Sequence, residues 1–348
     1  MKKKKVLHIL NTGSYSGAEN VVITIINNTK AEVDSVYLAK DGSIRNILKE
    51  NGIEFYSVTK LSYKELRKAV KGIKPDIIHA HDFTAGIMAA VSVFGVPIIN
   101  HLHNNSPWLK KLGLKSILYA ISTFRYKKIL TVSESVMDEF IFSNICKRKS
   151  EVIGNPIDLE KIIHSIENKN ICEPYEIAFL GRLSPQKNPL FFLEIIYELK
   201  KNMPNIQAKM IGDGELRKQV ENKIKELALE DNVELLGFQS NPYDYLYQSK
   251  VLCMPSAWEG FGLAAVEALA LGKPVVASPV GGLVNIVDES CGRLCRTIEE
   301  YCTEIMILLA NNEIYQEKVI ASISQIKRLD NKECYIKKLC DSYNVPKI

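Results

Sequence analysis

The sequence predicts an α/β protein of two doubly wound domains, each built on a mostly parallel sheet. Its 348 residues are enough for two domains of ordinary size. Short, continuously apolar runs alternate with amphipathic stretches of helical period, as in parallel sheets that are covered by helices on both faces. This alternation pauses at GNPID (154–158) and then starts again, which indicates two successive sheets.

The first series opens with a strand, a glycine-bearing loop and a helix. Its predicted strands are VLHIL (6–10), PDIIHAH (75–81), VPIINHLH (96–103) and KKILTVS (127–133), its first loop is NTGSYSG (11–17) and its first helix is AENVVITIINN (18–28). Ligands of open parallel sheets bind beyond the carboxyl ends of the strands. The loops that follow these strands are therefore the expected functional positions.

The second series repeats the pattern. Its predicted strands are YEIAFLG (175–181), NIQAKMIG (205–212), VELLG (233–237), KVLCMPS (250–256) and KPVVAS (273–278), and its helices are NPLFFLEIIYELKK (188–201) and ELRKQVENKIKELAL (215–229). We predict a first domain over 1–160, a second over 161–325, and a C-terminal helix over 326–348 that packs back on the first. The polar segment HSIENKNICEP (164–174) suits a linker, and an interdomain cleft is expected to hold the site.

Composition excludes several classes of protein. The chain is 46% hydrophobic and 24% charged, the balance of a globular protein that is not membrane-spanning, and no apolar run approaches the roughly 18 residues of a transmembrane helix. The N-terminus is too soon polar for a secretory signal, so a cytoplasmic location is expected. The eight cysteines form no CxxC pair, and Cys291, Cys295 and Cys302 lack zinc-ligand spacing, so reduced, buried thiols are expected.

The charge is divided unevenly along the chain. Residues 1–155 carry 23 Lys and Arg against 13 Asp and Glu, whereas the remainder carries 22 against 27. A basic first half points to an anionic partner, such as nucleic acid, a membrane surface or a phosphate-bearing substrate. Because no nucleic-acid reader motif is present, nucleic acid is not expected.

Two loops of the second half carry candidate chemistry. GRLSPQKNP (181–189) follows a strand and supplies Arg182 and Lys187 at the start of a helix, which suits a diphosphate, although two solvated surface cations fit equally. WEGFGLAAVEA (258–268) places Glu259 on a turn and Glu267 on the following helix, where both carboxylates can accept hydrogen bonds from the hydroxyls of one elongated ligand. The alternative is a capped helix with one buried glutamate.

The second half resembles the family-4 retaining glycosyltransferases. Glu259 and Glu267 match the E-x7-E motif of that family, GRLSPQKNP its Arg-x4-Lys diphosphate site, and IGDGEL and VELLGF the loops between them. The likeness covers residues 177–282 and extends more weakly over 5–158. It implies a GT-B fold of two Rossmann-like domains, a nucleotide-sugar donor, and catalysis without a metal or other cofactor.

The resemblance also implies roles for particular residues. Arg182 and Lys187 would hold the diphosphate, Glu259 the transferred sugar and Glu267 the ribose, while His103 of INHLHNN (99–105) would be the active-site histidine. The implied catalytic residues are His103, Arg182, Lys187 and Glu259. The implied donor-binding residues are Gly17, Gly181, Arg182, Lys187, Gly212, Gly214, Phe238, Glu259, Gly260, Phe261, Gly262, Leu263 and Glu267. The chain departs from the family at Ser16, where a glycine is usual, and at Asn285, where a glutamate is common.

Histidines form two pairs at strand ends, His79 with His81 and His101 with His103. Each pair points to one face of its strand, so four imidazoles can converge. A zinc or iron site is conceivable, but carboxylate ligands at suitable spacing are sparse, which favours substrate contact or core packing.

The segment WLKKLGLKSILYAISTFRYKK (108–128) reads as a basic amphipathic helix with aromatics. Its apolar stripe is Leu114, Ile117, Leu118 and Ile121. Such a helix is typical of a membrane surface, and the Lys2–Lys5 run adds further positive charge. The alternative is an ordinary helix that packs on the sheet.

We therefore expect a retaining hexosyltransferase that uses a nucleotide-diphosphate sugar, with uridine diphosphate the commonest in the family. The expected acceptor is a hydroxyl of a glycan or lipid-linked intermediate, in the synthesis of a bacterial surface polysaccharide such as capsule or exopolysaccharide. The expected location is cytoplasmic, peripheral on the inner membrane face. The alternatives are a nucleotide-sugar epimerase on the same fold and a non-catalytic nucleotide-sugar-binding partner of an assembly complex.

Overall fold

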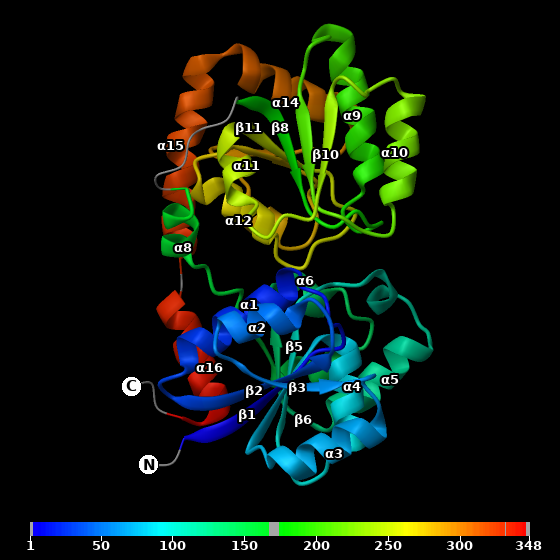
Figure 1. Ribbon diagram of the computed structural model, residues 1–348, viewed down its shortest axis with the longest axis vertical. Helices are drawn as coiled ribbons and strands as arrows, with labels where there is room; N and C mark the ends of the chain where they lie inside the picture. The colour runs from blue at the N-terminus through cyan, green and yellow to red at the C-terminus, as the bar shows by residue number, and fades with distance from the viewer. Residues whose placement is uncertain (1–2, 167–173, 331, 346–348) are drawn as a thin grey trace. The chain divides into compact units, whose positions relative to one another are not determined.

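The computed structural model describes residues 3–166, 174–330 and 332–345, and the chain divides into two compact units (Figure 1). Unit 1 comprises Met1–Pro156 with Asn331–Ile348, and unit 2 comprises Ile157–Asp330. Most of the predicted linker, residues 167–173, lies outside the described residues, as does Lys2 of the basic N-terminal run.

Unit 1 is built on a parallel sheet of seven strands in the order β3-β2-β1-β4-β5-β6-β7. The strands are β1 (Lys4–Ile9), β2 (Val33–Lys40), β3 (Glu54–Val58), β4 (Ile77–His81), β5 (Ile98–Leu102), β6 (Tyr126–Thr131) and β7 (Ser150–Val152). The chain moves outward from β1 in one direction and then returns to start in the other at β4. The neighbours β1 and β4 therefore form the topological switch point of this sheet.

Helices cover both faces of the unit 1 sheet. They are α1 (Gly17–Thr29), α2 (Ile44–Glu50), α3 (Tyr63–Ile73), α4 (Asp82–Ser92), α5 (Leu114–Thr123), α6 (Glu134–Asp138), α7 (Ser143–Cys146), α16 (Lys332–Tyr343) and the 3₁₀ turns η1 (Pro107–Lys110) and η2 (Lys147–Lys149). Helix α16 packs against α1, and the ammonium of Lys4 on β1 donates to the carbonyl oxygen of Tyr343 over 3.1 Å. The C-terminal helix is therefore part of unit 1.

Unit 2 is built on a parallel sheet of six strands in the order β10-β9-β8-β11-β12-β13. The strands are β8 (Tyr175–Leu180), β9 (Ala208–Ile211), β10 (Val233–Gly237), β11 (Ser249–Met254), β12 (Val275–Ala277) and β13 (Gly292–Leu294). The helices are α8 (Leu159–His164), α9 (Pro189–Asn202), α10 (Arg217–Glu226), α11 (Tyr243–Gln248), α12 (Leu263–Ala270), α13 (Leu283–Ile286), α14 (Ile298–Ala310) and α15 (Asn312–Leu329). The switch point of this sheet lies between β8 and β11.

The core of unit 2 has two apolar layers, one on each face of the sheet. One layer is formed by α9, α10 and α14, with Phe179 and Phe192 among its buried side chains. The other is formed by α8, α11, α12 and α15, with Leu252 and Leu269 at its centre. Because strands are buried on both faces, they read as continuous apolar runs, which is the pattern that predicted them.

The structure corrects four details of the sequence-based picture. Strands β2 and β3 were not among the predicted strands. Helix α10 begins at Arg217 instead of residue 215 and ends where Ala228 adopts a left-handed φ of 50°. Residues 326–329, assigned above to the C-terminal helix, are the last turn of α15 in unit 2. The segment 108–128 is a 3₁₀ turn, a short helix and the start of β6, because Gly113 is extended (φ −173°) and Tyr126 enters the sheet. Within the described parts of the chain, none of the helices combines the length and the apolarity needed to span a membrane.

Candidate active site

The candidate donor-side residues all lie in unit 2, on the loops that follow the carboxyl ends of four neighbouring strands. The loop after β8 carries Arg182 and Lys187, and the loop after β11 carries Glu259. Gly212 and Gly214 follow β9, and Phe238 follows β10. The two loops that hold the charged groups flank the switch point between β8 and β11, where open α/β sheets bind their ligands.

Lys187 and Glu259 form an ion pair across this switch point. The Lys187 ammonium donates to Oε2 of Glu259 over 2.5 Å, and the two side chains are only 17% and 10% exposed. Ser256 Oγ donates more weakly to the same oxygen over 3.5 Å. In addition, the backbone N–H of Ala257 donates to the carbonyl of Gln186 over 2.8 Å, which ties the two loops together. The sequence assigned these two side chains to different parts of one ligand, and the structure places them in contact.

Arg182 lies on the same loop but is more accessible. Its side chain is 65% exposed, and its Nε lies 3.6 Å from Oε2 of the equally accessible Glu215. The sequence placed Glu215 in the first turn of a helix, whereas it precedes α10 in the structure. An exposed pair of this kind contributes little to stability, so the guanidinium can exchange Glu215 for an anionic ligand at little cost.

Two glycines allow the loops to approach each other closely. Gly212 has a φ of 139°, and a Cβ at this position would lie 2.0 Å from the carbonyl oxygen of Gly181. Gly262, with a φ of 106°, is the N-cap of α12, where a Cβ would lie 2.7 Å from Leu283 Cδ2. Both positions adopt backbone conformations that side-chain-bearing residues rarely tolerate. The first amides of α12 therefore begin beside the ion pair, at the positive end of the helix.

The second glutamate of the motif lies within α12. Glu267 is partly buried, and the hydroxyl of Tyr243 on α11 donates to its Oε1 over 3.4 Å. Gly260 is buried, Phe261 and Leu263 are partly buried, and Phe238 is 55% exposed at the end of β10. Tyr243 was not identified from the sequence, because only the packing of α11 beside α12 brings it to Glu267.

In unit 1 the glycine-bearing loop after β1 is closed by a buried carboxylate. Helix α1 begins at Gly17, and Glu19 in its first turn is buried. Its two carboxylate oxygens accept hydrogen bonds from the hydroxyls of Thr12, over 2.6 Å, and of Ser16. Ser16, which stands where the family usually has glycine, thus holds the loop through its side chain.

His103 lies just beyond the end of β5, with its ring partly buried. Its backbone N–H donates to the carboxylate of Asp82 over 3.0 Å, and its Nε2 lies 2.9 Å from Nδ1 of His81. Burial lowers the pKa of His103 to about 4, so the ring is neutral at physiological pH. Burial also raises the pKa of Asp82 to about 6. His103 therefore offers a neutral imidazole, as the acceptor-side histidine of the sequence prediction requires.

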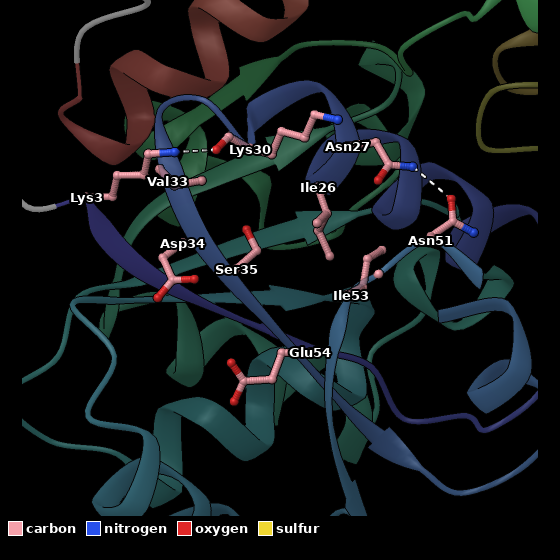
Figure 2. A pocket seen from close by; sticks show the side chains of 11 residues that line it. Lys3, Ile26, Asn27, Lys30, Val33, Asp34, Ser35, Asn51, Ile53 and Glu54 are labelled. Atoms are coloured by element: carbon pink, nitrogen blue, oxygen red, sulfur yellow. Dashed lines mark hydrogen bonds between the residues drawn. The ribbon is translucent and has the colours of Figure 1, made fainter. Parts of the chain in front are cut away.

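A hollow in unit 1 lies at the other edge of the sheet, near the N-terminal ends of β1, β2 and β3 (Figure 2). Lys3 donates to the carbonyl of Lys30 over 2.7 Å, and Asn27 donates to Asn51 over 2.9 Å at its rim. Its lining combines aliphatic side chains with a few solvated polar groups. We assign no function to it, because the candidate residues gather at the opposite edge of the sheet.

The fold and the site define a two-domain nucleotide-sugar enzyme of the GT-B class, and comparison with known proteins identifies its family. Residues 15–161 match the Glycosyltransferase Family 4 domain, and residues 161–323 match the domain described as Glycosyl transferases group 1. An uncharacterized glycosyltransferase of Methanocaldococcus jannaschii is 30% identical over 88% of this chain and 80% of its own length. The chain belongs to this glycosyltransferase family, as its motifs predicted.

Similarity extends to characterised relatives and to solved structures. The UDP-Gal:alpha-D-GlcNAc-diphosphoundecaprenol alpha-1,3-galactosyltransferase of Escherichia coli is 28% identical over 78% of both chains. Anabaena HepE in complex with UDP and glucose superimposes with a TM-score of 0.85, at 20% identity, over 98% of this chain and 99% of that one. S. aureus TarM, in complex with UDP and two glycan ligands, superimposes with a TM-score of 0.79, at 13% identity, over 98% and 100%. These structures confirm the predicted fold.

Proposed function

We propose that this glycosyltransferase transfers a hexose-type sugar, with retention of its anomeric configuration, from a UDP-sugar to a hydroxyl of a glycan or lipid-linked acceptor. The observation that carries the proposal is the Lys187–Glu259 pair at the switch point of unit 2. The two charges neutralise each other without a ligand, and a donor provides each with a better partner. Its diphosphate takes the ammonium and its sugar hydroxyls take the carboxylate.

The proposed mechanism is electrostatic. Lys187, Arg182 and the first amides of α12 stabilise negative charge on the leaving diphosphate while the sugar gains oxocarbenium character. Glu259 orients the sugar hydroxyls, and Glu267 holds the ribose. We assign no carboxylate as a covalent nucleophile, so the acceptor hydroxyl attacks from the face that the diphosphate leaves. His103 contacts the transferred sugar or the acceptor as a neutral imidazole. No metal is proposed for the transfer step.

The names of several relatives support the choice of acceptor. The E. coli relative acts on a diphosphoundecaprenol-linked sugar. A Campylobacter jejuni relative, 27% identical over 93% of both chains, is an N-acetyl-D-galactosaminyltransferase acting on a PP-undecaprenol-linked glycan. A lipid-linked acceptor for this chain would place it in the synthesis of a cell-surface polysaccharide such as capsule or exopolysaccharide.

The test of this function is a donor screen followed by product analysis. UDP-sugars are first ranked by thermal stabilisation, because a ligand at 100 times its Kd adds about 2.7 kcal/mol to the free energy of unfolding. The best donor is then incubated with undecaprenyl-diphosphate-linked sugars, and the anomeric configuration of the product is read by NMR. An inverted product would contradict retention, and an epimerised free sugar formed without acceptor would favour the epimerase alternative.

The Arg182→Ala variant tests the electrostatic mechanism. Because the diphosphate gains charge only as it leaves, the variant should lower kcat more than it weakens donor binding. Lys209→Ala, on β9 of the same sheet, serves as the control. An Arg182→Ala enzyme with unchanged kcat would contradict the assigned role.

We also propose that unit 1 docks on an anionic membrane surface. The predicted apolar stripe of α5 faces outward instead of packing on the sheet, with Leu114 74% and Ile121 61% exposed. Further exposed apolar side chains extend this surface, which we call the α5 patch: Val91, Phe94, Leu112, Leu114, Ile117, Leu118, Ile121, Phe124, Ile141 and Ile145. So large an apolar surface on a water-exposed helix is unusual unless it is covered.

Basic side chains surround the α5 patch and suggest what covers it. They are Lys110, Lys111, Lys115, Arg125, Lys147, Arg148 and Lys149. Each cation near an anionic leaflet contributes about 1 kcal/mol, so this combination fits a lipid surface better than a neutral protein partner. The location that follows is the cytoplasmic face of the membrane, where the lipid-linked acceptor would lie.

Vesicle flotation tests the membrane proposal. The protein should float with vesicles of phosphatidylglycerol and phosphatidylcholine, less with pure phosphatidylcholine, and less at high salt. Replacing Leu114, Ile121 and Phe124 by Ser should abolish flotation. Ile320→Ser on α15, where the native side chain is 66% exposed, is the matched control and should leave it unchanged. Equal flotation of both variants would contradict the proposal.

A further inference from the structure

Five of the six histidines in the chain gather on one face of the unit 1 sheet. His8 on β1 is in register with His79 on β4, and His81 on β4 is in register with His101 on β5. Registered neighbours share a face, as do residues two apart on one strand, so all these rings and that of His103 point the same way. Their centroids lie 4.2–5.6 Å from their neighbours. The sequence predicted four converging imidazoles, and His8 is the fifth.

The hydrogen bonds of this histidine cluster leave many ring nitrogens without a partner. Nδ1 of His8 lies 3.1 Å from Nε2 of His81, whose Nδ1 lies 2.9 Å from Nε2 of His103, and Nδ1 of His79 lies 2.6 Å from the Tyr343 hydroxyl. Within the described residues, the nitrogens that lack a partner are His8 Nε2, His79 Nε2, His101 Nδ1, His101 Nε2 and His103 Nδ1. Core packing alone does not explain this, because aliphatic side chains would fill the space without burying polar atoms.

The charge state of the rings suits a cation without protons. Burial lowers the pKa of each of the five, with His8 reduced to about 3, so all are neutral near pH 7 and each keeps a lone pair. A neutral imidazole is the form that binds metals. Asp82 accepts the backbone N–H of His103 and so fixes the start of the loop that carries the last ring.

We propose that His81, His101 and His103 form a binding site for a divalent transition-metal ion of the Zn²⁺ class. The ligand atoms of these three side chains all lie within 4.8 Å of one another. A tetrahedral ion with nitrogen ligands at about 2.0–2.1 Å needs them about 3.4 Å apart, which small side-chain rotations supply. Imidazole ligands without carboxylates favour Zn²⁺, Co²⁺, Ni²⁺ or Cu²⁺ over Mg²⁺ and Ca²⁺.

A second trio, His8, His79 and His81, meets the same distance criterion but suits an ion less well. All three of its rings are buried, and His79 is already engaged with Tyr343. His103, in contrast, is only partly buried, so the first trio has an entry path and room for a solvent ligand. The site joins the ends of β4 and β5, and it is independent of the proposed transfer reaction, which uses no metal.

Cobalt binding tests this site. The tag-free, metal-stripped full-length protein is titrated with Co²⁺, and the visible ligand-field bands of tetrahedral cobalt are recorded. The wild-type protein should bind one equivalent, and His101→Gln should weaken binding at least about 100-fold. His164→Gln on α8 of unit 2 removes the one histidine outside the cluster and should bind like wild type. Absence of binding by the wild type, or wild-type binding by His101→Gln, would overturn the proposal.

A second measurement needs no variant and therefore does not depend on its folding. In ¹⁵N-histidine-labelled protein, Zn²⁺ should shift the ring-nitrogen resonances of three buried histidines and leave that of His164 unchanged. Shifts confined to His164, or no shifts at all, would refute the site. Because both readouts measure metal binding and not transfer, failure of this proposal would leave the proposed function standing.

Discussion

The two sheets share a topology but carry opposite chemistry at their switch points. In unit 1 the strands at and beside the switch point, β1, β4 and β5, end in a cluster of neutral imidazoles, most of them fully buried. In unit 2 the loops after β8 and β11 hold Lys187 and Glu259, which are nearly buried but charged and paired. The comparison shows that the doubly wound fold fixes where a ligand binds, whereas a few side chains decide which ligand it is.

The difference follows from how each site deals with burial. The imidazoles of unit 1 lose their charge, because desolvation lowers the pKa of every ring. The ammonium and carboxylate of unit 2 keep their charges by contacting each other. A neutral site is suited to coordination or to hydrogen bonding, and a charged one to a diphosphate.

The largest expected effect comes from removing the cation of the charged site. Lys187→Met should lower kcat about 10²–10³-fold, the usual loss when one group that stabilises a leaving anion is removed. Lys201→Met, on an exposed face of α9, should leave kcat unchanged. The measurement is steady-state transfer with the donor identified by the screen.

The same pair should also show coupling in stability. Lys187→Met leaves the Glu259 carboxylate nearly buried and unpaired, so its cost should exceed the sum expected from additivity with Glu259→Gln by about 1–3 kcal/mol. Urea unfolding of the two single variants and the double variant measures this coupling. Additive losses would show that the two charges act independently and would weaken the comparison.

The next effect tests the close approach of loops in unit 2. Gly212→Ala should destabilise unit 2 by about 3–5 kcal/mol, because the new Cβ would meet the Gly181 carbonyl at 2.0 Å in a backbone conformation that alanine avoids. Gly72→Ala in α3 of unit 1 is the control, since nothing lies within 4 Å of its Cβ position. That variant should be neutral or slightly stabilising. Thermal unfolding of both variants checks the prediction.

The smallest effect concerns pH. Burial lowers the pKa of Lys273, between α12 and β12, to about 8 from its usual 10.5. Between pH 8 and 10.5 the unfolded chain therefore binds more protons at this site, and its contribution to stability rises with pH. Lys273→Met should stabilise unit 2 by about 2 kcal/mol at pH 7, an advantage that shrinks toward pH 10. A constant difference across this range would show that the ammonium is not desolvated.

Much of the fold could be predicted because parallel sheets leave a strong signature. Strands buried on both faces are continuous apolar runs, and nine of those predicted appear at the expected places, β1 and β8 among them. Strand β2, VDSVYLAK, and strand β3, EFYSV, were missed, because their partly exposed residues break the apolar run. Element ends were also harder to predict, since the start of α10 depends on a backbone contact from Leu216 to Leu183 in another loop.

The sequence by itself determined the family, the alternation of elements and the residue types at the strand ends, because these depend on local pattern and spacing. Only the tertiary structure decided which side chains meet. It paired Lys187 with Glu259 across two loops, turned the stripe of α5 outward and added His8 to the other imidazoles. Such contacts join residues tens to hundreds of positions apart, and strand order and register alone bring them within reach.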